Sequence, residues 1–176
     1  RSVFDAGRVE LQSGLGAYWS FSPDGSDRPN IDYSLSTYRI GLMLDTPEGV
    51  GFFRGCPEFL VEGFYGSVFE GPGDWLAGGN LILRYNFVPE RTKWSSYIQI
   101  GAGGLWNDIY KDQSQSLVGQ SFEFSLLAAV GVRYQWNAKW GVALEGGYRH
   151  ISNADMAERN RGLDSLGVLG GLTYSF

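Results

Sequence analysis

The amino-acid sequence predicts an all-β fold, an eight-stranded antiparallel transmembrane β-barrel that takes in residues 1–176 as a single domain. Three observations predict it. Long segments alternate apolar and polar residues with a period of two, their number is even, and the last one ends on Phe176 after apolar residues at alternate positions. This ending resembles the C-terminal signal by which outer-membrane barrels are recognised for assembly.

The clearest alternation runs from Ser121 to Trp136. The even positions of this segment carry one apolar face, formed by Phe122, Phe124, Leu126, Ala128, Val130, Val132, Tyr134 and Trp136. Most of the odd positions are polar or small. Strands of soluble proteins usually have five or six residues, so a regular alternation of this length is typical of a tilted strand that crosses a bilayer.

The other segments follow in order along the chain. The eight predicted strands are roughly 8–21, 31–44, 58–69, 76–88, 95–108, 120–136, 139–152 and 164–176. In the first, alternate residues from Val9 to Phe21 form the apolar face, and in the fourth this face runs from Leu81 to Phe87. The second and third alternate less regularly. An even number of strands closes an antiparallel sheet and leaves no unpaired edge in lipid.

The opposite, inward-facing positions collect charges of both signs. They are Glu10, Arg39, Glu62, Arg84, Glu123, Arg133, Glu145 and Arg149. A barrel of eight strands is too narrow for an open pore, so these side chains are expected to pair with one another in the interior. Short turns and both termini are expected on the periplasmic side, with long loops outside. The connection 45–57 is longer than this rule predicts, and Phe52 and Phe53 indicate an interfacial excursion there.

Composition excludes several classes of protein. The chain has 14 Lys and Arg against 19 Asp and Glu, a net charge of −5, which argues against a nucleic-acid partner. A single cysteine, Cys56, excludes an internal disulfide. The mean hydropathy of −0.17 looks soluble, but alternating residues average to near zero in a membrane barrel. No signal peptide is visible, so the chain is either cytosolic or an already processed form. The predicted barrel favours the second alternative, a chain in the bacterial outer membrane whose signal peptide is already removed.

A candidate catalytic set lies at the outer end of the last two predicted strands. His150 and Ser152 continue the apolar face of segment 139–152, and Asp164 shares the parity of the apolar face of segment 164–176. A hydroxyl, an imidazole and a carboxylate within reach form the nucleophile, base and orienting acid of acyl transfer. The alternative interpretation is that His150 and Ser152 only mark the aqueous boundary of the strand.

The segments Arg149-His150-Ile151-Ser152-Asn153-Ala154 and Asn160-Arg161-Gly162-Leu163-Asp164-Ser165 resemble the C-terminal signature of the lipid A 3-O-deacylase (PagL) family of outer-membrane barrel enzymes. The resemblance is specific across about 149–176. It implies an esterase that removes the 3-O-linked acyl chain of lipid A, with Ser152 as nucleophile, His150 as general base and Asp164 as orienting acid. It also implies Asn153 and the backbone amide of Asp155 as oxyanion donors, and a further polar position at Asn160.

Two residues depart from the family pattern, which has Glu at the position of Asp164 and Gly at that of Asp155. A carboxylate at Asp155 opposes the negative charge of an oxyanion unless it points away. The chemistry needs no cofactor and no metal. Arg149, Arg159 and Arg161 are candidates for contacts with lipid A phosphates. The expected partners are lipopolysaccharide and outer-membrane lipids, and a homodimer is left open. The alternative function is a non-enzymatic small barrel, an anchor or a narrow porin.

Overall fold

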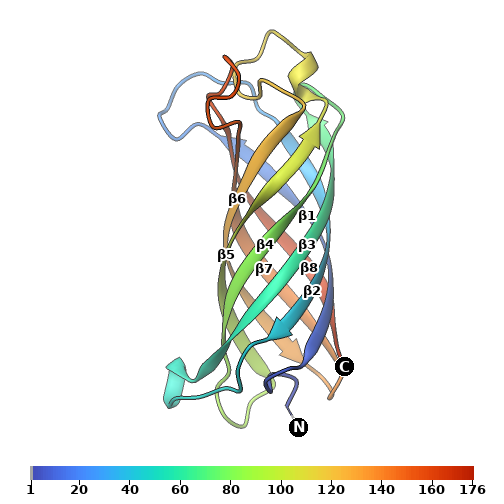
Figure 1. The fold of residues 1–176 in the computed structure, drawn as a ribbon, viewed down its shortest axis with the longest axis vertical. Helices are drawn as coiled ribbons and strands as arrows, with labels where there is room; N and C mark the ends of the chain where they lie inside the picture. The colour runs from blue at the N-terminus through green and yellow to red at the C-terminus, as the bar shows by residue number, and fades with distance from the viewer. Residues whose placement is uncertain (1) are drawn as a thin grey trace.

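The computed structural model describes residues 2–176, which form one closed barrel of eight antiparallel strands in chain order (Figure 1). The strands are β1 (Val9–Phe21), β2 (Asp32–Met43), β3 (Gly55–Glu70), β4 (Trp75–Phe87), β5 (Trp94–Asn107), β6 (Phe122–Gln135), β7 (Trp140–Ser152) and β8 (Leu163–Ser175). Pairing of β1 with β8 closes the sheet, for example Leu15 with Gly170. The predicted fold class and strand number are confirmed.

One strand boundary needs correction. The segment 45–57 was expected to be a connection, but β3 already begins at Gly55 and includes Cys56 and Pro57. Pro57 fits the strand because the ladder uses only its carbonyl at this point, which accepts from the Leu44 amide at 2.9 Å. The connection that remains contains a short 3₁₀ helix, η1 (Gly51–Phe53).

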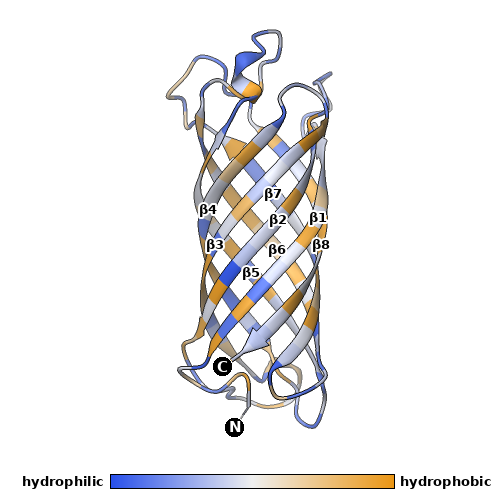
Figure 2. Ribbon diagram, turned by 90° about the vertical axis from the view of Figure 1, so that its right-hand side faces the viewer, coloured by the Kyte–Doolittle hydropathy of each residue, from blue (hydrophilic) through white to orange (hydrophobic). Residues whose placement is uncertain are grey.

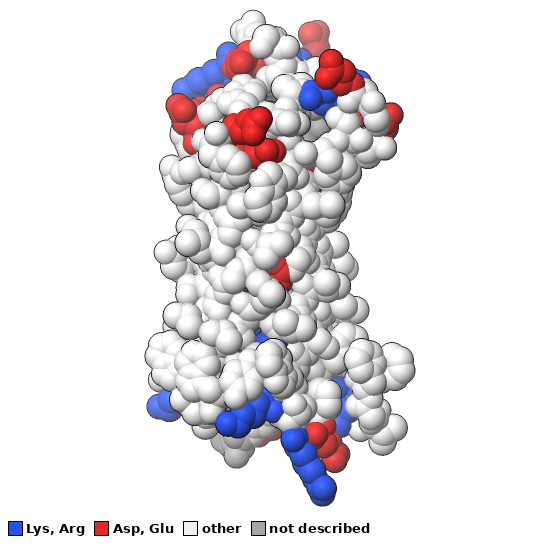
Figure 3. All heavy atoms as spheres, turned by 180° about the vertical axis from the view of Figure 1, so that it is seen from behind, with Lys and Arg blue, Asp and Glu red and all other residues white. Residues whose placement is uncertain are grey.

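The outer wall is apolar, as the alternation predicts. Side chains in the middle of the strands are about half to two-thirds exposed, for example Leu15 (65%), Ile100 (65%) and Val130 (62%). Figure 2 shows apolar and polar residues alternating along the strands, and Figure 3 shows charged side chains gathered at the two ends of the barrel, with few between them. No helix among the described residues is long and apolar enough to cross a membrane.

Buried ion pairs fill the middle of the lumen. Arg39 bridges Glu62 and Glu145, each at 2.7 Å, and Arg149 pairs with the other oxygen of Glu62 at 2.7 Å. All four side chains are at most 5% exposed. A cavity lined by Arg39, Tyr97 and Glu145 measures about 20 Å³, which holds about one water molecule. The predicted pairing of interior charges is confirmed for these residues.

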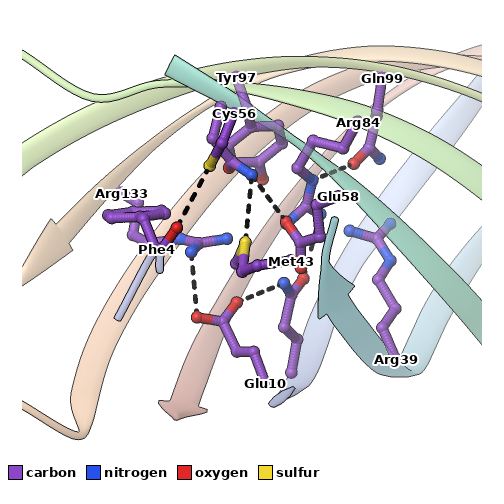
Figure 4. Close-up of polar contacts among 12 residues, drawn as sticks. Phe4, Glu10, Arg39, Met43, Cys56, Glu58, Arg84, Tyr97, Gln99 and Arg133 are labelled. Carbon is purple, nitrogen blue, oxygen red and sulfur yellow. Dashed lines mark hydrogen bonds and ion pairs between the residues drawn. The ribbon is translucent and has the colours of Figure 1, made fainter. Parts of the chain in front are cut away.

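A second set of ion pairs lies nearer the chain termini, since Glu10 is opposite Ser175 in the ladder, and Figure 4 shows its side chains. Arg133 pairs with Glu10 at 3.0 Å, and Arg84 pairs with Glu58 at 3.3 Å. Glu58 was not among the expected interior charges, because the alternation of its segment is less regular. Phe4 closes this end of the lumen, with its ring 5.4 Å from the Arg133 guanidinium carbon. Charge balance inside the barrel therefore rests on more glutamates than the sequence indicated.

The two ends of the barrel differ. The connections 44–54, 88–93 and 136–139 lie at one end together with both termini, which is the predicted periplasmic end (Figure 1). The long loops 22–31, 108–121 and 153–162 lie at the other end, where they pack over a buried apolar cluster that includes Ile109, Leu117 and Leu163. This arrangement of short turns and long loops is the one expected for an outer-membrane barrel.

Candidate functional site

His150 and Ser152 lie on the outer wall at the loop end of β7. In the ladder with β6, His150 is opposite Leu126 and Ser152 is opposite Phe124, whose side chains are 51% and 39% exposed. The His150 side chain is 28% exposed. Residues two apart on a strand lie about 6.6 Å apart along one face, so the hydroxyl and the imidazole are neighbours.

Asp164 lies directly opposite His150 in the ladder between β7 and β8. The His150 Nδ1 atom is 2.7 Å from Asp164 Oδ1. Because an ionised carboxylate only accepts hydrogen bonds, Nδ1 carries the hydrogen and the Nε2 lone pair stays available as a base. The structure thus brings together two of the three predicted catalytic residues, His150 and Asp164.

The Ser152 hydroxyl makes no hydrogen bond to His150 within residues 2–176. Its side chain is half-buried at the end of β7. Proton transfer needs an approach of about 3 Å between Ser152 Oγ and His150 Nε2, and such contacts often form only when substrate binds. The third member of the predicted set is therefore near the pair but not engaged with it.

Two groups that sequence reasoning missed also contact Asp164. The Tyr148 hydroxyl donates to Asp164 Oδ1 at 2.5 Å, and Arg28 Nη1 lies 4.0 Å from Oδ2. Tyr148 has the same parity as His150, so the alternation could have placed it beside Asp164. Arg28 comes from the loop 22–31, far away in the sequence, and no local pattern marks it.

Arg28 is itself fixed by its own loop. Its Nη2 donates to Asp24 at 2.8 Å, its Nε donates to the Ser26 hydroxyl at 2.9 Å, and its side chain is 10% exposed. A hydrogen bond from the Ser26 hydroxyl, together with that from Arg28, holds the pKa of Asp24 well below its usual range. Asp24 therefore stays ionised at neutral pH and keeps the guanidinium beside Asp164.

Gly162 covers one edge of the His150 ring. Its φ of +76° lies in the left-handed region that favours glycine, and a Cβ there would lie 2.8 Å from the His150 Cε1 atom. The Gly162 amide donates to the Leu117 carbonyl at 3.1 Å. The loop 153–162 is thus tied to the loop 108–121, and its backbone limits the positions open to the imidazole.

The turn after Ser152 is strained. The Met156 amide donates to the Asn153 carbonyl at 3.0 Å, and the two residues between them, Ala154 and Asp155, have φ values of 51° and 64°. Such values are unusual for residues other than glycine. This geometry gives a physical reason for the glycine that the family pattern has at position 155. Aspartate tolerates this region better than most residues do.

Asn160 holds this turn through both ends of its side-chain amide. Its Oδ1 accepts from the Asn153 backbone amide at 2.8 Å, and its Nδ2 donates to the Asp155 carboxylate at 2.8 Å. The Asp155 carboxylate, which could oppose an oxyanion, is therefore bound by an amide donor. Asn160 positions the segment next to Ser152.

The oxyanion role expected of the Asn153 side chain stays a prediction, and in this structure the side chain is engaged with other groups. This side chain is fully buried, and its amide donates to the Arg159 carbonyl at 2.9 Å and to Glu123 Oε1 at 3.4 Å. Residue 153 follows Ser152 with the opposite parity, so its side chain points inward, away from the outer wall. In this arrangement the Asn153 amide joins the loop 153–162 to β6, and it makes no hydrogen bond to Ser152 within residues 2–176.

The three arginines expected to bind lipid A phosphates, Arg149, Arg159 and Arg161, have different surroundings in the structure. Arg149 is buried in the lumen with Glu62, so it cannot reach a lipid headgroup. Arg159 donates to the carbonyls of Tyr110, Asp112 and Gln115 at 2.8–3.1 Å and so clamps the loop 108–121. Arg161 has a side chain that is 46% exposed at the rim. Among these three arginines, Arg161 is the most exposed, and its Nη2 atom lies 4.0 Å from Asp24 Oδ2.

No group of three or more metal-ligating side chains occurs within residues 2–176. The outer-wall site contains one imidazole, one carboxylate, one hydroxyl and one phenol. What these residues can do chemically is nucleophilic acyl transfer with a histidine base.

Comparison with solved structures supports the fold. Neisserial surface protein A (NspA) matches with a TM-score of 0.67 and 15% identity, over 97% of this chain and 99% of that one. The outer-membrane enzyme PagL matches with a TM-score of 0.55 and 21% identity, over 92% of this chain and 97% of that one. The N-terminal β-barrel domain of Pseudomonas aeruginosa OprF matches with a TM-score of 0.54 and 14% identity, over 97% and 98%. At these identities the likeness shows the barrel fold alone.

Sequence comparisons are more specific. A search of curated proteins finds no match. The family model of the lipid A 3-O-deacylase, PagL, matches residues 57–173, which is most of the chain and includes His150, Ser152 and Asp164. Together with the outer-membrane barrels that share its fold, this match places the protein in the outer membrane. The chain belongs to the lipid A 3-O-deacylase (PagL) family.

Proposed function

We propose that this protein hydrolyses the ester-linked acyl chain at the 3-position of lipid A, at the outer wall of the barrel beside β7. The observation that carries the proposal is the 2.7 Å contact between His150 Nδ1 and Asp164 Oδ1 on a surface that faces lipid. A polar group on such a surface is costly and calls for an explanation. Membership of the PagL family supplies the substrate class.

The depth of the site in the membrane agrees with this substrate. Ser152 is opposite Phe124 in the ladder with β6, and Asp164 is opposite Phe21 in the ladder with β1. Both phenylalanines are 39% exposed, and aromatic side chains of this kind gather at the boundary between headgroups and acyl chains. The ester bonds of a lipid lie at the same boundary.

The proposed reaction has two halves. Ser152 Oγ attacks the ester carbonyl while His150 Nε2 takes the hydroxyl proton, and the tetrahedral intermediate then expels the sugar oxygen, which receives that proton from His150. A water molecule next attacks the acyl-Ser152 ester, with His150 again as base. This step releases the fatty acid and restores the serine. Asp164 keeps Nδ1 protonated and stabilises the imidazolium in both halves.

Neighbouring groups support these steps. Tyr148 and Arg28 act as positioning residues, because both contact the Asp164 carboxylate and neither is hydrogen-bonded to the imidazole within residues 2–176. The backbone amide of Asp155 is the proposed oxyanion donor. One such donor is worth about 100–1,000-fold in rate.

The test is mass spectrometry of lipid A incubated with purified protein in detergent or vesicles. We expect the wild type to produce a species lighter by one hydroxyacyl chain and the Ser152→Ala variant to produce none. Ser121→Ala is a matched control, since Ser121 is exposed at the same rim and its hydroxyl has no role in the proposal. Deacylation by Ser152→Ala at the wild-type rate would contradict the assignment. A wild type that leaves lipid A unchanged would favour a non-enzymatic barrel.

A further inference from the structure

The connection between β2 and β3 is the longest of the three at the periplasmic end. It spans residues 44–54, against 88–93 and 136–139 for the other two. Turns at this end of outer-membrane barrels are usually short. The proposed function leaves this segment without a role, and it lies at the opposite end of the barrel from His150.

The connection has a defined structure. Glu48 and Gly55 form a β-bridge with reciprocal hydrogen bonds of 3.0 and 2.9 Å, which extends β3 beyond the barrel. The chain then reverses through η1, where the Arg54 amide donates to the Gly51 carbonyl at 3.3 Å. Figure 1 shows η1 set to the side of the barrel, at its lower left.

The exposed end of this segment is apolar. Val50, Phe52 and Phe53, here called the aromatic tip, are 86%, 64% and 74% exposed. Three large apolar side chains this close together in water would each forgo about 1.5–3 kcal/mol of burial. An exposed apolar cluster on an ordered loop therefore indicates a surface that meets something other than water.

The aromatic tip is attached to the lipid-facing wall of the barrel. The Phe52 ring stacks on Phe87 at 5.3 Å between centroids, and the Tyr85 hydroxyl donates to the Phe53 carbonyl at 3.1 Å. Tyr85 and Phe87 continue the outward face of β4, on which Leu83 is 57% exposed. The tip thus extends the apolar wall sideways and does not cover the mouth of the barrel.

Other aromatic pairs lie around the same rim. They are Trp94 with Tyr134 at 5.0 Å, Trp140 with Tyr174 at 4.8 Å, and Tyr174 with Phe176 at 5.1 Å. These pairs belong to β5, β6, β7, β8 and the C-terminal residue. Aromatic side chains in such a ring lie at the interface between the acyl chains and the headgroups of a bilayer. The aromatic tip supplies this ring in the sector of β3 and β4.

We propose that the aromatic tip inserts into the periplasmic leaflet of the outer membrane and anchors this end of the barrel to phospholipid. Its depth is the headgroup–acyl boundary, about 5–10 Å into the interfacial region, as for other apolar faces that lie in a membrane surface. The surroundings of Arg54, the cation next to the tip in the sequence, favour the acyl chains of the lipid over its headgroup as the binding partner. Arg54 is engaged with the Val88 carbonyl at 2.7 Å and with Glu90 at 3.9 Å, so within residues 50–54 no free cation is presented to an anionic headgroup.

The test uses nitroxide labels on single cysteines in a Cys56→Ala background, with the intact protein in phospholipid vesicles. Phe53→Cys reports on the tip, Leu83→Cys on the lipid-facing wall, and Glu90→Cys on water at the same rim. We expect the label at 53 to collide with dissolved oxygen nearly as often as the label at 83. Its collisions with a water-soluble nickel chelate should be several-fold fewer than those at 90. Val50→Cys repeats the measurement at the most exposed side chain of the tip, which is 86% exposed.

Lipid composition and dilution complete the test. The collision rates of the label at 53 with oxygen and with the nickel chelate should be the same in phosphatidylcholine vesicles and in vesicles with added phosphatidylglycerol, because residues 50–54 present no free cation. If the chelate reaches 53 as freely as 90, the tip faces the periplasm and the inference is wrong. Spin–spin broadening at 53 that disappears on dilution with unlabelled protein would instead assign the tip to a contact between two barrels. None of these outcomes depends on whether the protein deacylates lipid A.

Discussion

Charged and polar side chains meet in two regions of this barrel, and their surroundings differ. In the lumen, Arg39, Glu62, Glu145 and Arg149 pair with one another, and their side chains are at most 5% exposed. On the outer wall, His150 and Asp164 form one contact of similar length, 2.7 Å, but His150 is 28% exposed. The lumen pairs are cross-linked by several ionic contacts, whereas the outer pair leaves one ring nitrogen open.

This difference separates a structural network in the lumen from the proposed reactive site on the outer wall. A buried ion pair stabilises a fold only while every partner is present, since an unpaired charge in the lumen is costly. A catalytic pair needs a group with an unfilled hydrogen-bonding position that a substrate can reach. We therefore expect substitutions in the lumen to change stability, and substitutions on the outer wall to change activity.

The largest effect is expected for His150→Ala. Removing the base of a serine esterase costs about a 10⁶-fold fall in kcat, as seen when a member of such a triad is deleted. Lipid A deacylation should become undetectable by mass spectrometry, while the barrel still folds, as judged by its shifted migration on an unheated gel. If the His150→Ala variant kept most of the wild-type activity, His150 would not be the base. The alternative interpretation, that His150 only marks the aqueous boundary of the strand, would then be favoured.

Asp164→Asn should lower kcat about 10⁴-fold, because an amide at this position no longer enforces the imidazole tautomer with hydrogen on Nδ1. Asp164→Glu should keep more activity than Asp164→Asn, since a carboxylate is retained. Initial rates of acyl release measure both. The exposed Asp27, with no described partner among residues 2–176, provides the control Asp27→Asn. Equal rates for the Asn and Glu variants would argue against an orienting role.

Glu62→Gln tests the lumen. It removes the carboxylate that Arg149 uses and should lower the free energy of unfolding by about 3–5 kcal/mol. Urea unfolding in micelles measures this, and the matched control Glu90→Gln should change it by less than about 1 kcal/mol, because Glu90 is exposed at the rim. Loss of activity in a fully folded Glu62→Gln protein would contradict the expectation that substitutions in the lumen change stability and leave activity unchanged.

Tyr148→Phe should have the smallest effect. It removes the 2.5 Å hydrogen bond to Asp164 and leaves the ring in place, so kcat should fall about tenfold, the equivalent of about 1.4 kcal/mol, with KM unchanged. Tyr65→Phe is the control on the same outer wall, since Tyr65 is 52% exposed and far from Asp164 in the strand order. A change in KM alone would mean that Tyr148 contacts the lipid and does not position the acid.

Much of the fold was predictable because the signal is local. A period of two needs only neighbouring residues, and it placed Leu126 and His150 on the outer wall and Arg39 and Glu145 in the lumen. The strand boundaries agree within about two residues, apart from the start of β3. There, Pro57 indicates the end of a strand in the sequence because proline has no amide hydrogen. In the structure only its carbonyl takes part, as acceptor from the Leu44 amide.

The candidate site was predictable in part. Strand parity and the family resemblance together indicated His150, Ser152 and Asp164. The contacts of Arg28, Gly162 and Asn153 were not predictable, because they depend on how three loops fold over the barrel end. Asn153 shows the limit most clearly, since a residue next to the proposed nucleophile turns inward and binds Glu123.

The sequence by itself determined that this chain is a membrane barrel and which side of each strand meets lipid, because alternation is a property of the extended backbone. Only the tertiary structure decided the register that puts Asp164 opposite His150 and the loop contact that brings Arg28 to 4.0 Å from that carboxylate. It also decided the sideways position of the aromatic tip. These features come from contacts between residues far apart in the chain, which no local period encodes.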